Sequence, residues 1–245
     1  MSSFLLVHGA WHGAWCWQRV TPLLEARGHR VVAVDLPGHG SDPTPPQSVS
    51  LQDYARCVSE AIADQREAPF VVGHSMGGLV ISQAAELAPE RVRGLIYLCA
   101  YLPTSDQSLG MLALRDQQSL VVGALDVDSE TGLSTISADL ARRAFYNDCQ
   151  AEEVRWAHAQ LGCEPLHAFE ATVSLSEARF GRVPRAYIYC ELDAVIGPAL
   201  QREMEAASPC RVAVSMQTGH SPFLSAPQEL ARHLESIAQR LSSGA

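Results

Sequence analysis

One serine lies in a setting that favours nucleophilic catalysis. Ser75 is the centre of the motif GHSMG (73–77), which follows the apolar run PFVV and precedes the helical run MGGLVISQAAELA. A serine on a tight turn from strand to helix has an exposed hydroxyl, and the flanking glycines remove side chains that would collide there. The start of the helix adds free N–H groups where negative charge would develop. The motif therefore predicts that Ser75 is a nucleophile.

A serine hydroxyl is a weak nucleophile and needs a base within hydrogen-bonding distance. Of the nine histidines, His220 fits best, because it follows the last predicted core strand and precedes the final helix. This is the position of the base in the chain order serine, acid, histidine. His74 is expected to point away from the serine beside it. Five other histidines occur in contexts that look exposed or belong to the segment between the core strands: His29, His39, His158, His167 and His233.

Two carboxylates compete for the role of the acid that orients the base. Glu191 and Asp193 both follow the predicted strand Pro184–Cys190. Asp193 lies further into the turn, from where it can reach the loop of His220. We therefore favour Asp193 and expect Glu191 to be a surface carboxylate.

The first predicted strand ends in HGAWHG (8–13). A His-Gly segment at this place normally supplies one N–H group of an oxyanion hole, and the residue after the nucleophile supplies the other. The predicted donors are the backbone N–H groups of Ala10 and Met76. His8 is expected to form a hydrogen bond with the loop backbone. For His12, a structural role and a role as proton carrier both stay open.

These residues need a framework that brings them together. Six short apolar runs without polar alternation predict strands that are covered on both faces; they are Ser3–His8, Arg30–Leu36, Pro69–His74, Val92–Ala100, Pro184–Cys190 and Cys210–Met216. Five segments with helical spacing lie between and after them: Ala14–Arg27, Leu51–Arg66, Met76–Ala88, Pro198–Ala207 and Pro227–Leu241. This alternation predicts an α/β fold, a mostly parallel sheet flanked by helices.

The alternation stops between residues 103 and 182. This interval contains two helical patches, Ala138–Asp148 and Ala151–Leu161, but no strong buried strand. We therefore predict a core made of residues 1–102 and 183–245, with a mostly helical cap of residues 103–182 inserted in it. Five apolar side chains are expected to line a substrate pocket under this cap: Trp11, Leu112, Phe145, Trp156 and Phe169.

The composition limits the possible partners. The chain has 245 residues, of which 47% are hydrophobic, and a formal net charge of −9. An acidic chain without Lys/Arg clusters argues against binding to nucleic acid or to an anionic membrane surface. The N-terminal apolar run is too short for a signal peptide or a spanning helix. Seven cysteines without C-x-x-C spacing favour reduced thiols over disulfides or a metal site, so a cytoplasmic protein is expected.

Four stretches of the chain form a combination that is typical of one family; they are HGAWHGAWCW, GHRVVAVDLPGHG, GHSMGG and GRVPRAYIYCELDAVI. With them the chain resembles, over nearly its whole length, the plant methylesterase and hydroxynitrile lyase branch of the α/β-hydrolases, together with its bacterial esterase relatives. It implies a six-stranded core under a compact helical cap. It also implies hydrolysis of small carboxylic esters without a cofactor, with Ser75, Asp193 and His220 as the triad. The oligomeric state stays open between monomer and homodimer.

Two departures from the branch favour an esterase over a lyase. Hydroxynitrile lyases of this branch place a lysine directly after the catalytic histidine, where this chain has Ser221. They also carry a threonine near the start of the oxyanion loop, where this chain has Gly9 and Ala10. The alternatives are a C–C lyase or a cofactor-free oxygenase on the same fold, and a non-catalytic small-molecule receptor. The expected substrate is a small ester with an apolar or aromatic acyl group.

Overall fold

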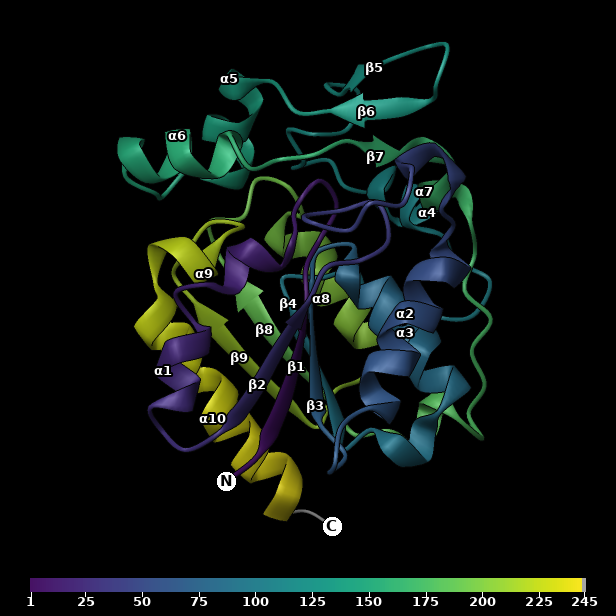
Figure 1. The fold of residues 1–245 in the computed structure, drawn as a ribbon, viewed down its shortest axis with the longest axis vertical. Coiled ribbons are helices and arrows are strands. Elements are labelled where there is room, and N and C mark those ends of the chain that lie inside the picture. Colours follow the sequence, from purple (N-terminus) through teal and green to yellow (C-terminus); the bar gives the residue numbers. More distant parts are fainter. Residues whose placement is uncertain (244–245) are drawn as a thin grey trace.

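The computed structural model describes residues 1–243 and is built around one central sheet (Figure 1). Its six strands have the order β2-β1-β3-β4-β8-β9, and all neighbouring pairs are parallel. The strands are β1 (Ser3–Val7), β2 (Arg30–Val34), β3 (Phe70–His74), β4 (Gly94–Leu98), β8 (Arg185–Cys190) and β9 (Val212–Met216). The fold class predicted from the sequence is confirmed.

Three of the four interior strands are buried along their whole length, as their uninterrupted apolar sequences require. Every residue of β1, β3 and β4 is buried, whereas the edge strands β2 and β9 are partly exposed. Burial on both faces requires helices on both sides of the sheet. In Figure 1, α2 and α3 cover one side, and α1 and α10 cover the other.

The helices that flank the sheet are α1 (Thr21–Glu25), α2 (Leu51–Ala63), α3 (Gly77–Leu87), α8 (Pro198–Ala207), α9 (Pro222–Ser225) and α10 (Pro227–Ser243). Short 3₁₀ turns occur at η1 (Ala14–Trp17), η2 (Pro46–Ser48), η3 (Pro89–Arg91) and η5 (Phe180–Arg182). The helix predicted over residues 14–27 is thus divided into η1 and α1. Pro22 lies in the first turn of α1 and has no N–H group to continue a helix from η1. No helix among residues 1–243 has the length and apolarity to cross a membrane.

The segment between β4 and β8 lies over the carboxyl ends of the strands (Figure 1). It contains α4 (Leu109–Ala113), α5 (Ala138–Leu140), the π-helical turn η4 (Ala141–Phe145), α6 (Ala151–His158) and α7 (Leu166–Glu170). It also contains a small antiparallel sheet that the sequence did not predict, formed by β5 (Asp126–Val127), β6 (Leu133–Thr135) and β7 (Glu164–Pro165). Strands of two or three residues are too short to give a periodic pattern.

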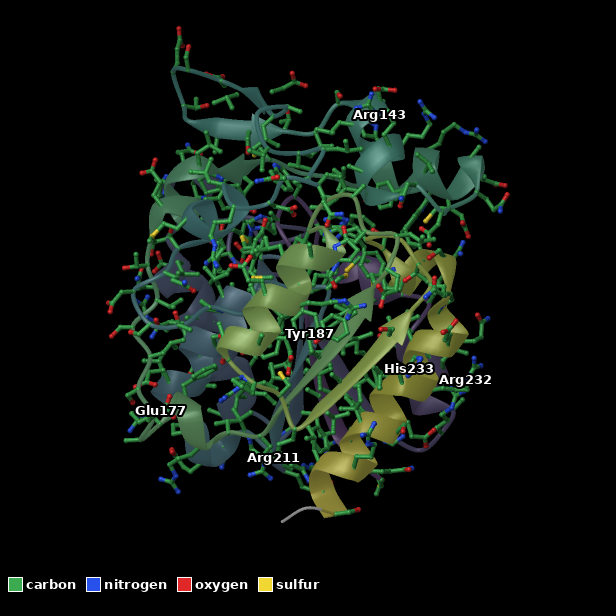
Figure 2. All side chains as sticks on the ribbon, turned by 180° about the vertical axis from the view of Figure 1, so that it is seen from behind. Arg143, Glu177, Tyr187, Arg211, Arg232 and His233 are labelled. Carbon is green, nitrogen blue, oxygen red and sulfur yellow. The ribbon has the colours of Figure 1, made fainter. Side chains whose placement is uncertain are left out.

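One buried tyrosine secures the chain where it leaves the core for this segment. Tyr187 of β8 (Figure 2) stacks on Tyr97 of β4, with ring centroids 6.2 Å apart. Its hydroxyl donates a hydrogen bond of 2.6 Å to the carbonyl oxygen of Ala100, directly after β4. The start of the inserted segment is therefore tied to the neighbouring strand.

Candidate active site

Ser75 lies on the turn between β3 and α3 in a left-handed conformation, with φ of 55°. The turn is so tight that a Cβ atom on Gly73 would come within 2.6 Å of the carbonyl oxygen of Gly77. A Cβ atom on Gly77 would come within 2.8 Å of the carbonyl oxygen of His8. Both positions therefore require glycine. The turn holds Ser75 in a strained backbone conformation, and Ser75 lines a cavity above the sheet.

Two backbone N–H groups are available beside this serine. Ala10 and Met76 line the same cavity as Ser75. Within residues 1–243, neither of their N–H groups donates a hydrogen bond. Free N–H groups next to a nucleophile can bind the negative charge that develops on a carbonyl oxygen under attack.

His220 is oriented by a buried carboxylate. Its Nδ1 lies 2.8 Å from Oδ2 of Asp193, and both side chains are fully buried. Oδ1 of Asp193 accepts the N–H groups of Val195 at 2.7 Å and Ile196 at 2.9 Å, and Nε2 of Gln201 donates to Oδ2 at 3.2 Å. Because the ionised carboxylate only accepts, Nδ1 of His220 carries the hydrogen and Nε2 keeps its lone pair. This is the tautomer that a general base requires.

Nε2 of His220 is buried and has no hydrogen-bond partner in the described part of the chain. No hydrogen bond joins it to the hydroxyl of Ser75 in this structure. Catalytic hydrogen bonds are often long before substrate binds and shorten in the reacting complex. The unpaired Nε2 is therefore free to accept a proton.

Glu191, the competing carboxylate, lies on the surface and does not contact His220. Its oxygens accept hydrogen bonds from Ser215 at 2.6 Å and from Arg202 at 2.7 and 2.8 Å. These contacts lower the pKa of Glu191 below its ordinary value. The structure thus brings Asp193, and not Glu191, to the histidine.

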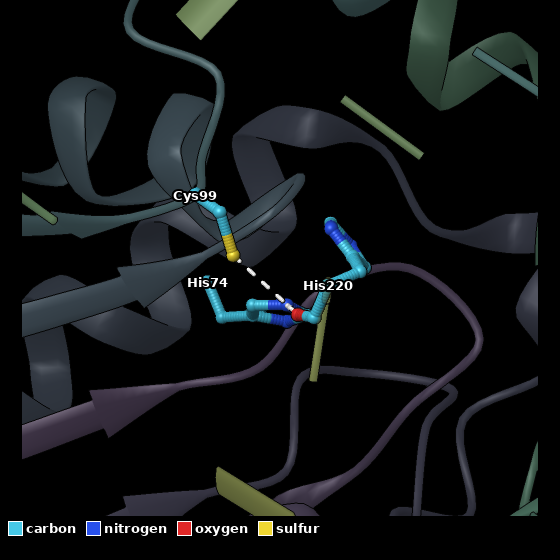
Figure 3. A group of neighbouring side chains, drawn as sticks. All are labelled: His74, Cys99 and His220. Atoms are coloured by element: carbon cyan, nitrogen blue, oxygen red, sulfur yellow. Dashed lines mark hydrogen bonds between the residues drawn. The ribbon is translucent and has the colours of Figure 1, made fainter. Parts of the chain in front are cut away.

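Two buried side chains hold the backbone of His220 (Figure 3). Nε2 of His74 lies 2.8 Å from the carbonyl oxygen of His220, so the ring nitrogen donates, and the thiol of Cys99 donates to the same oxygen at 3.4 Å. The three side chains are close enough together for metal binding. Burial, however, raises the pKa of the Cys99 thiol and lowers the pKa of His74, so Cys99 keeps its proton. The supporting role of His74 was not evident from the sequence, because its partner lies 146 positions away.

Two further histidines shape the loop that carries Ala10. Nδ1 of His12 donates to the carbonyl oxygen of Ala10 at 2.8 Å, and its Nε2 accepts the hydroxyl of Tyr146 at 2.9 Å. Nδ1 of His8 donates to the carbonyl oxygen of Gly9 at 2.8 Å, as expected. Burial lowers the pKa of each histidine to about 3, so both are uncharged near neutral pH. His12 is an anchor of the loop backbone.

The cavity at Ser75 has a volume of about 190 Å³, and no charged side chain lines it. Two of the five predicted pocket residues, Trp11 and Phe169, belong to its wall. Most of the remaining wall comes from the inserted segment, namely from Leu109, Gly110, Ala113, Leu114, Ser119, Val121, Val122, Gly123 and Leu125. Tyr101 and Val195 complete it from the core.

The other three predicted pocket residues do not line this cavity, which corrects the expectation. Phe145 packs edge-on against Trp11, with ring centroids 5.7 Å apart, and against His220 at 5.6 Å. Trp156 packs edge-on against Trp15 at 5.3 Å. Leu112 is buried within α4, while its neighbours on that helix face the cavity. Apolar character alone cannot tell which face of a short helix is turned to a pocket.

Known proteins resemble this chain in sequence and in fold. Residues 4–233 match the family described as alpha/beta hydrolase family. Methylesterase 2 of Arabidopsis thaliana is 34% identical over 259 residues, which cover 96% of this chain and 95% of that protein. Pyrethroid hydrolase of Sphingobium wenxiniae is 34% identical over 247 residues, which cover 97% and 88%. The crystal structure of tomato methylketone synthase I with 2-tridecanone has a TM-score of 0.88 and 28% identity, covering 98% of both chains.

These matches extend over almost the whole chain and are spread over plant and bacterial proteins. They confirm the branch that was predicted from the sequence, since a plant methylesterase and a bacterial hydrolase are both among the relatives. Their names also bear out the predicted enzyme class, a carboxylic-ester hydrolase. The chain therefore belongs to the alpha/beta hydrolase family.

Proposed function

We propose that this protein hydrolyses small carboxylic esters through an acyl-enzyme on Ser75. The observation that carries the proposal is the buried Asp193–His220 pair, which leaves the lone pair of Nε2 free. The proposal is further supported by the free N–H groups of Ala10 and Met76 at the same cavity as Ser75.

In the first half of the proposed reaction, Oγ of Ser75 attacks the ester carbonyl carbon while Nε2 of His220 takes the hydroxyl proton. The carbonyl oxygen becomes an oxyanion, which the N–H groups of Ala10 and Met76 bind. His220 then gives its proton to the leaving alcohol, and Asp193 stabilises the imidazolium in the meantime. In the second half, His220 removes a proton from water, whose oxygen attacks the acyl carbon. The bond from that carbon to Oγ of Ser75 then breaks, His220 gives its proton to Oγ, and the acid is released.

We propose that the acyl group is small and apolar and that residues 103–182 act as the cap that selects it. The cavity of about 190 Å³ is below the range of roughly 300–1,000 Å³ that is typical of pockets for drug-sized ligands. Its wall offers apolar side chains and no cation to bind a charged acyl group. Short-chain acyl esters should therefore react faster than esters with more than about ten carbons in the acyl chain.

The alternative of a C–C lyase is less well supported. According to the family resemblance, the lyases place a cationic lysine directly after the catalytic histidine. Here that position is Ser221, whose hydroxyl is buried without a partner among residues 1–243. An uncharged hydroxyl cannot stabilise an anionic leaving group such as cyanide as a cation does.

We further propose a cytoplasmic location and a small-molecule ester, and neither nucleic acid nor a membrane, as partner. All seven cysteines are free, and Cys16, Cys99 and Cys190 are buried in the core. Free thiols are typical of proteins from reducing compartments. The net charge of −9 agrees with the absence of nucleic acid among the proposed partners.

The proposal is tested with p-nitrophenyl acetate and butyrate and with a fluorophosphonate that labels activated serines. The wild-type protein should release p-nitrophenol, and mass spectrometry should find the phosphonate on Ser75. Ser75→Ala should lower kcat/KM by at least about 10⁴-fold and abolish labelling, with an unchanged circular dichroism spectrum. Label on another residue, or a variant that keeps more than a few per cent of the activity, contradicts the proposal.

A further inference from the structure

A buried polar cluster joins the inserted segment to the loop that carries Ala10. At its centre is Glu164 of β7, which is fully buried. Its Oε1 accepts the hydroxyl of Tyr54 at 2.9 Å, and its Oε2 lies 2.7 Å from Nε2 of His39. The backbone N–H of Trp11 donates to Oε2 at 3.3 Å. Tyr54 belongs to α2 and His39 to the loop after β2, so this carboxylate connects three parts of the core.

His39 faces an acceptor at each of its ring nitrogens. Its Nδ1 lies 3.1 Å from the carbonyl oxygen of Pro37, which can only accept a hydrogen bond. Its Nε2 lies 2.7 Å from Oε2 of Glu164, and against an ionised carboxylate both ring nitrogens carry hydrogens, which makes His39 a cation. Burial alone would lower the pKa of His39, but the adjacent Glu164 raises it above the ordinary value. The sequence placed His39 in an exposed context; the structure buries it in an ion pair with a residue 125 positions away.

The cluster holds Trp11 through its backbone and through its indole ring. Its backbone is left-handed, with φ of 62°, a conformation that is unfavourable for a residue other than glycine. Its N–H binds Glu164, and its indole Nε1 donates to the carbonyl oxygen and the hydroxyl of Ser134 on β6, both at 3.2 Å. The hydroxyl of Ser134 in turn donates to the carbonyl oxygen of Glu164 at 2.9 Å. The carbonyl oxygen of Trp11 accepts the N–H of Gly162 at 2.8 Å.

We propose that Glu164 is a positioning residue for the oxyanion hole: its carboxylate, paired with His39, holds Trp11 in the left-handed conformation and thereby fixes the direction of the Ala10 N–H. The Trp11 N–H and the Ala10 carbonyl belong to the same peptide unit, which Glu164 holds at the N–H and His12 holds at the carbonyl oxygen. The Ala10 N–H lies on the other side of the Ala10 Cα, so fixing this peptide restrains Ala10 and, through it, the direction of that N–H. The inference deepens the proposed function and rests on it, because it concerns the same oxyanion. It assigns a part of the proposed catalysis to the inserted segment.

The cationic partner explains how a carboxylate can serve at this place. An uncompensated negative charge close to the oxyanion hole would oppose the negative charge that forms during the reaction. His39 neutralises Glu164, so the carboxylate can orient the loop without that repulsion. A neutral acceptor would bind the Trp11 N–H more weakly, because hydrogen bonds to charged groups are roughly twice as strong.

The test compares Glu164→Gln with the wild-type protein and with Tyr97→Phe. The latter removes a buried hydroxyl that lies 2.7 Å from that of Ser82, outside the cluster and the cavity wall, and serves as a control for lost stability. We expect Glu164→Gln to lower kcat by about 10- to 100-fold, less than the loss of a whole oxyanion donor, with KM changed by less than about threefold. The affinity for a boronic acid that adds to Ser75, and the rate of fluorophosphonate labelling, should fall by a similar factor. Tyr97→Phe should leave all four quantities unchanged.

A folded Glu164→Gln variant with wild-type kcat and boronic acid affinity overturns the inference. So does a loss of kcat that Tyr97→Phe reproduces at equal loss of melting temperature. If Glu164→Gln does not fold, the double variant His39→Gln/Glu164→Gln, which buries no unpaired charge, is measured in the same way and read by the same criteria. A wild-type protein in which Ser75 is not labelled disproves the proposed function, and the inference with it. Normal labelling of both wild type and variant disproves the inference alone.

Discussion

The two sides of the cavity are built in different ways. Ser75, Asp193 and His220 follow β3, β8 and β9 at one edge of a parallel sheet, and buried hydrogen bonds fix the histidine and the acid. The opposite wall comes mostly from residues 109–125 of the inserted segment. Some apolar side chains of this wall are exposed to solvent, and Leu114 is 78% exposed. The comparison teaches that the groups proposed for the chemistry are held mainly by the sheet, whereas the proposed choice of acyl group falls to a wall that is only partly buried.

The largest effect is expected on the sheet side of the cavity, where Asp193 orients His220. Asp193→Asn should lower kcat by roughly 10⁴-fold, because an amide stabilises the wrong tautomer of His220 and cannot stabilise its charged form. Glu191→Gln is the matched control and should change kcat less than about twofold, since the side chain of Glu191 is hydrogen-bonded to Ser215 and Arg202 and not to His220 in the described part of the chain. Steady-state kinetics with p-nitrophenyl butyrate decides the point. Equal losses in the two variants would show that the acid is wrongly assigned.

The second prediction concerns acid pH and again the sheet side. The pKa values of His8 and His12 are lowered to about 3 in the folded protein, against an ordinary value of 6.5. The unfolded chain therefore binds more protons below pH 6.5, and the stability that the two uncharged rings contribute is complete above that pH. It is lost as the pH falls from 6.5 towards 3, by about 1 kcal/mol per pH unit for each histidine.

Urea unfolding at pH 7, 6 and 5 measures this loss. His12→Asn should lose stability less steeply than the wild-type protein between pH 6 and pH 5, because one of the two titrating rings is gone. The same pH slope in both proteins would mean that His12 is not kept uncharged by the fold.

The smallest effect is expected on the inserted side. Val121 lines the cavity and is buried, so Val121→Ala should enlarge the space for the acyl group. The rate ratio of butyryl to acetyl ester should rise by about tenfold, the value of one or two methylene groups in an apolar pocket. Trp156→Ala removes a side chain that packs on Trp15, outside the cavity, and should leave the ratio unchanged. A ratio that changes in Trp156→Ala and not in Val121→Ala would show that Trp156 lines the acyl pocket and that Val121 does not.

The sheet side could be predicted from the sequence because its signals are local. The motif around Ser75 lies directly between an apolar strand and a helix, and only a tight turn fits between them. The order of elements then placed His220 after the last strand and left two carboxylates after the strand before it. Periodicity could not decide between Asp193 and Glu191; the direction of each side chain depends on the turn after β8.

The inserted side could not be predicted to the same extent, because its structure depends on contacts with the core. The strands β5, β6 and β7 have two or three residues each. They are stabilised by pairing with one another and not by the strand propensity of their residues. Glu164 looks like a surface residue in the sequence, since its partners His39 and Tyr54 lie 125 and 110 positions away. The face that α4 turns to the cavity is likewise set by packing, so Leu112 was chosen in error.

The order of strands also governs when the proposed activity can arise during folding. β4 and β8 are neighbours in the sheet, but the whole inserted segment separates them along the chain. Pairings between distant segments close large loops and form slowly, whereas β3, the turn of Ser75 and α3 are contiguous. Asp193 and His220 therefore reach the serine only when β8 pairs with β4 and β9 pairs with β8. A nascent or truncated chain without β8 and β9 would have the serine but neither the acid nor the base, so the proposed hydrolysis requires the completed sheet.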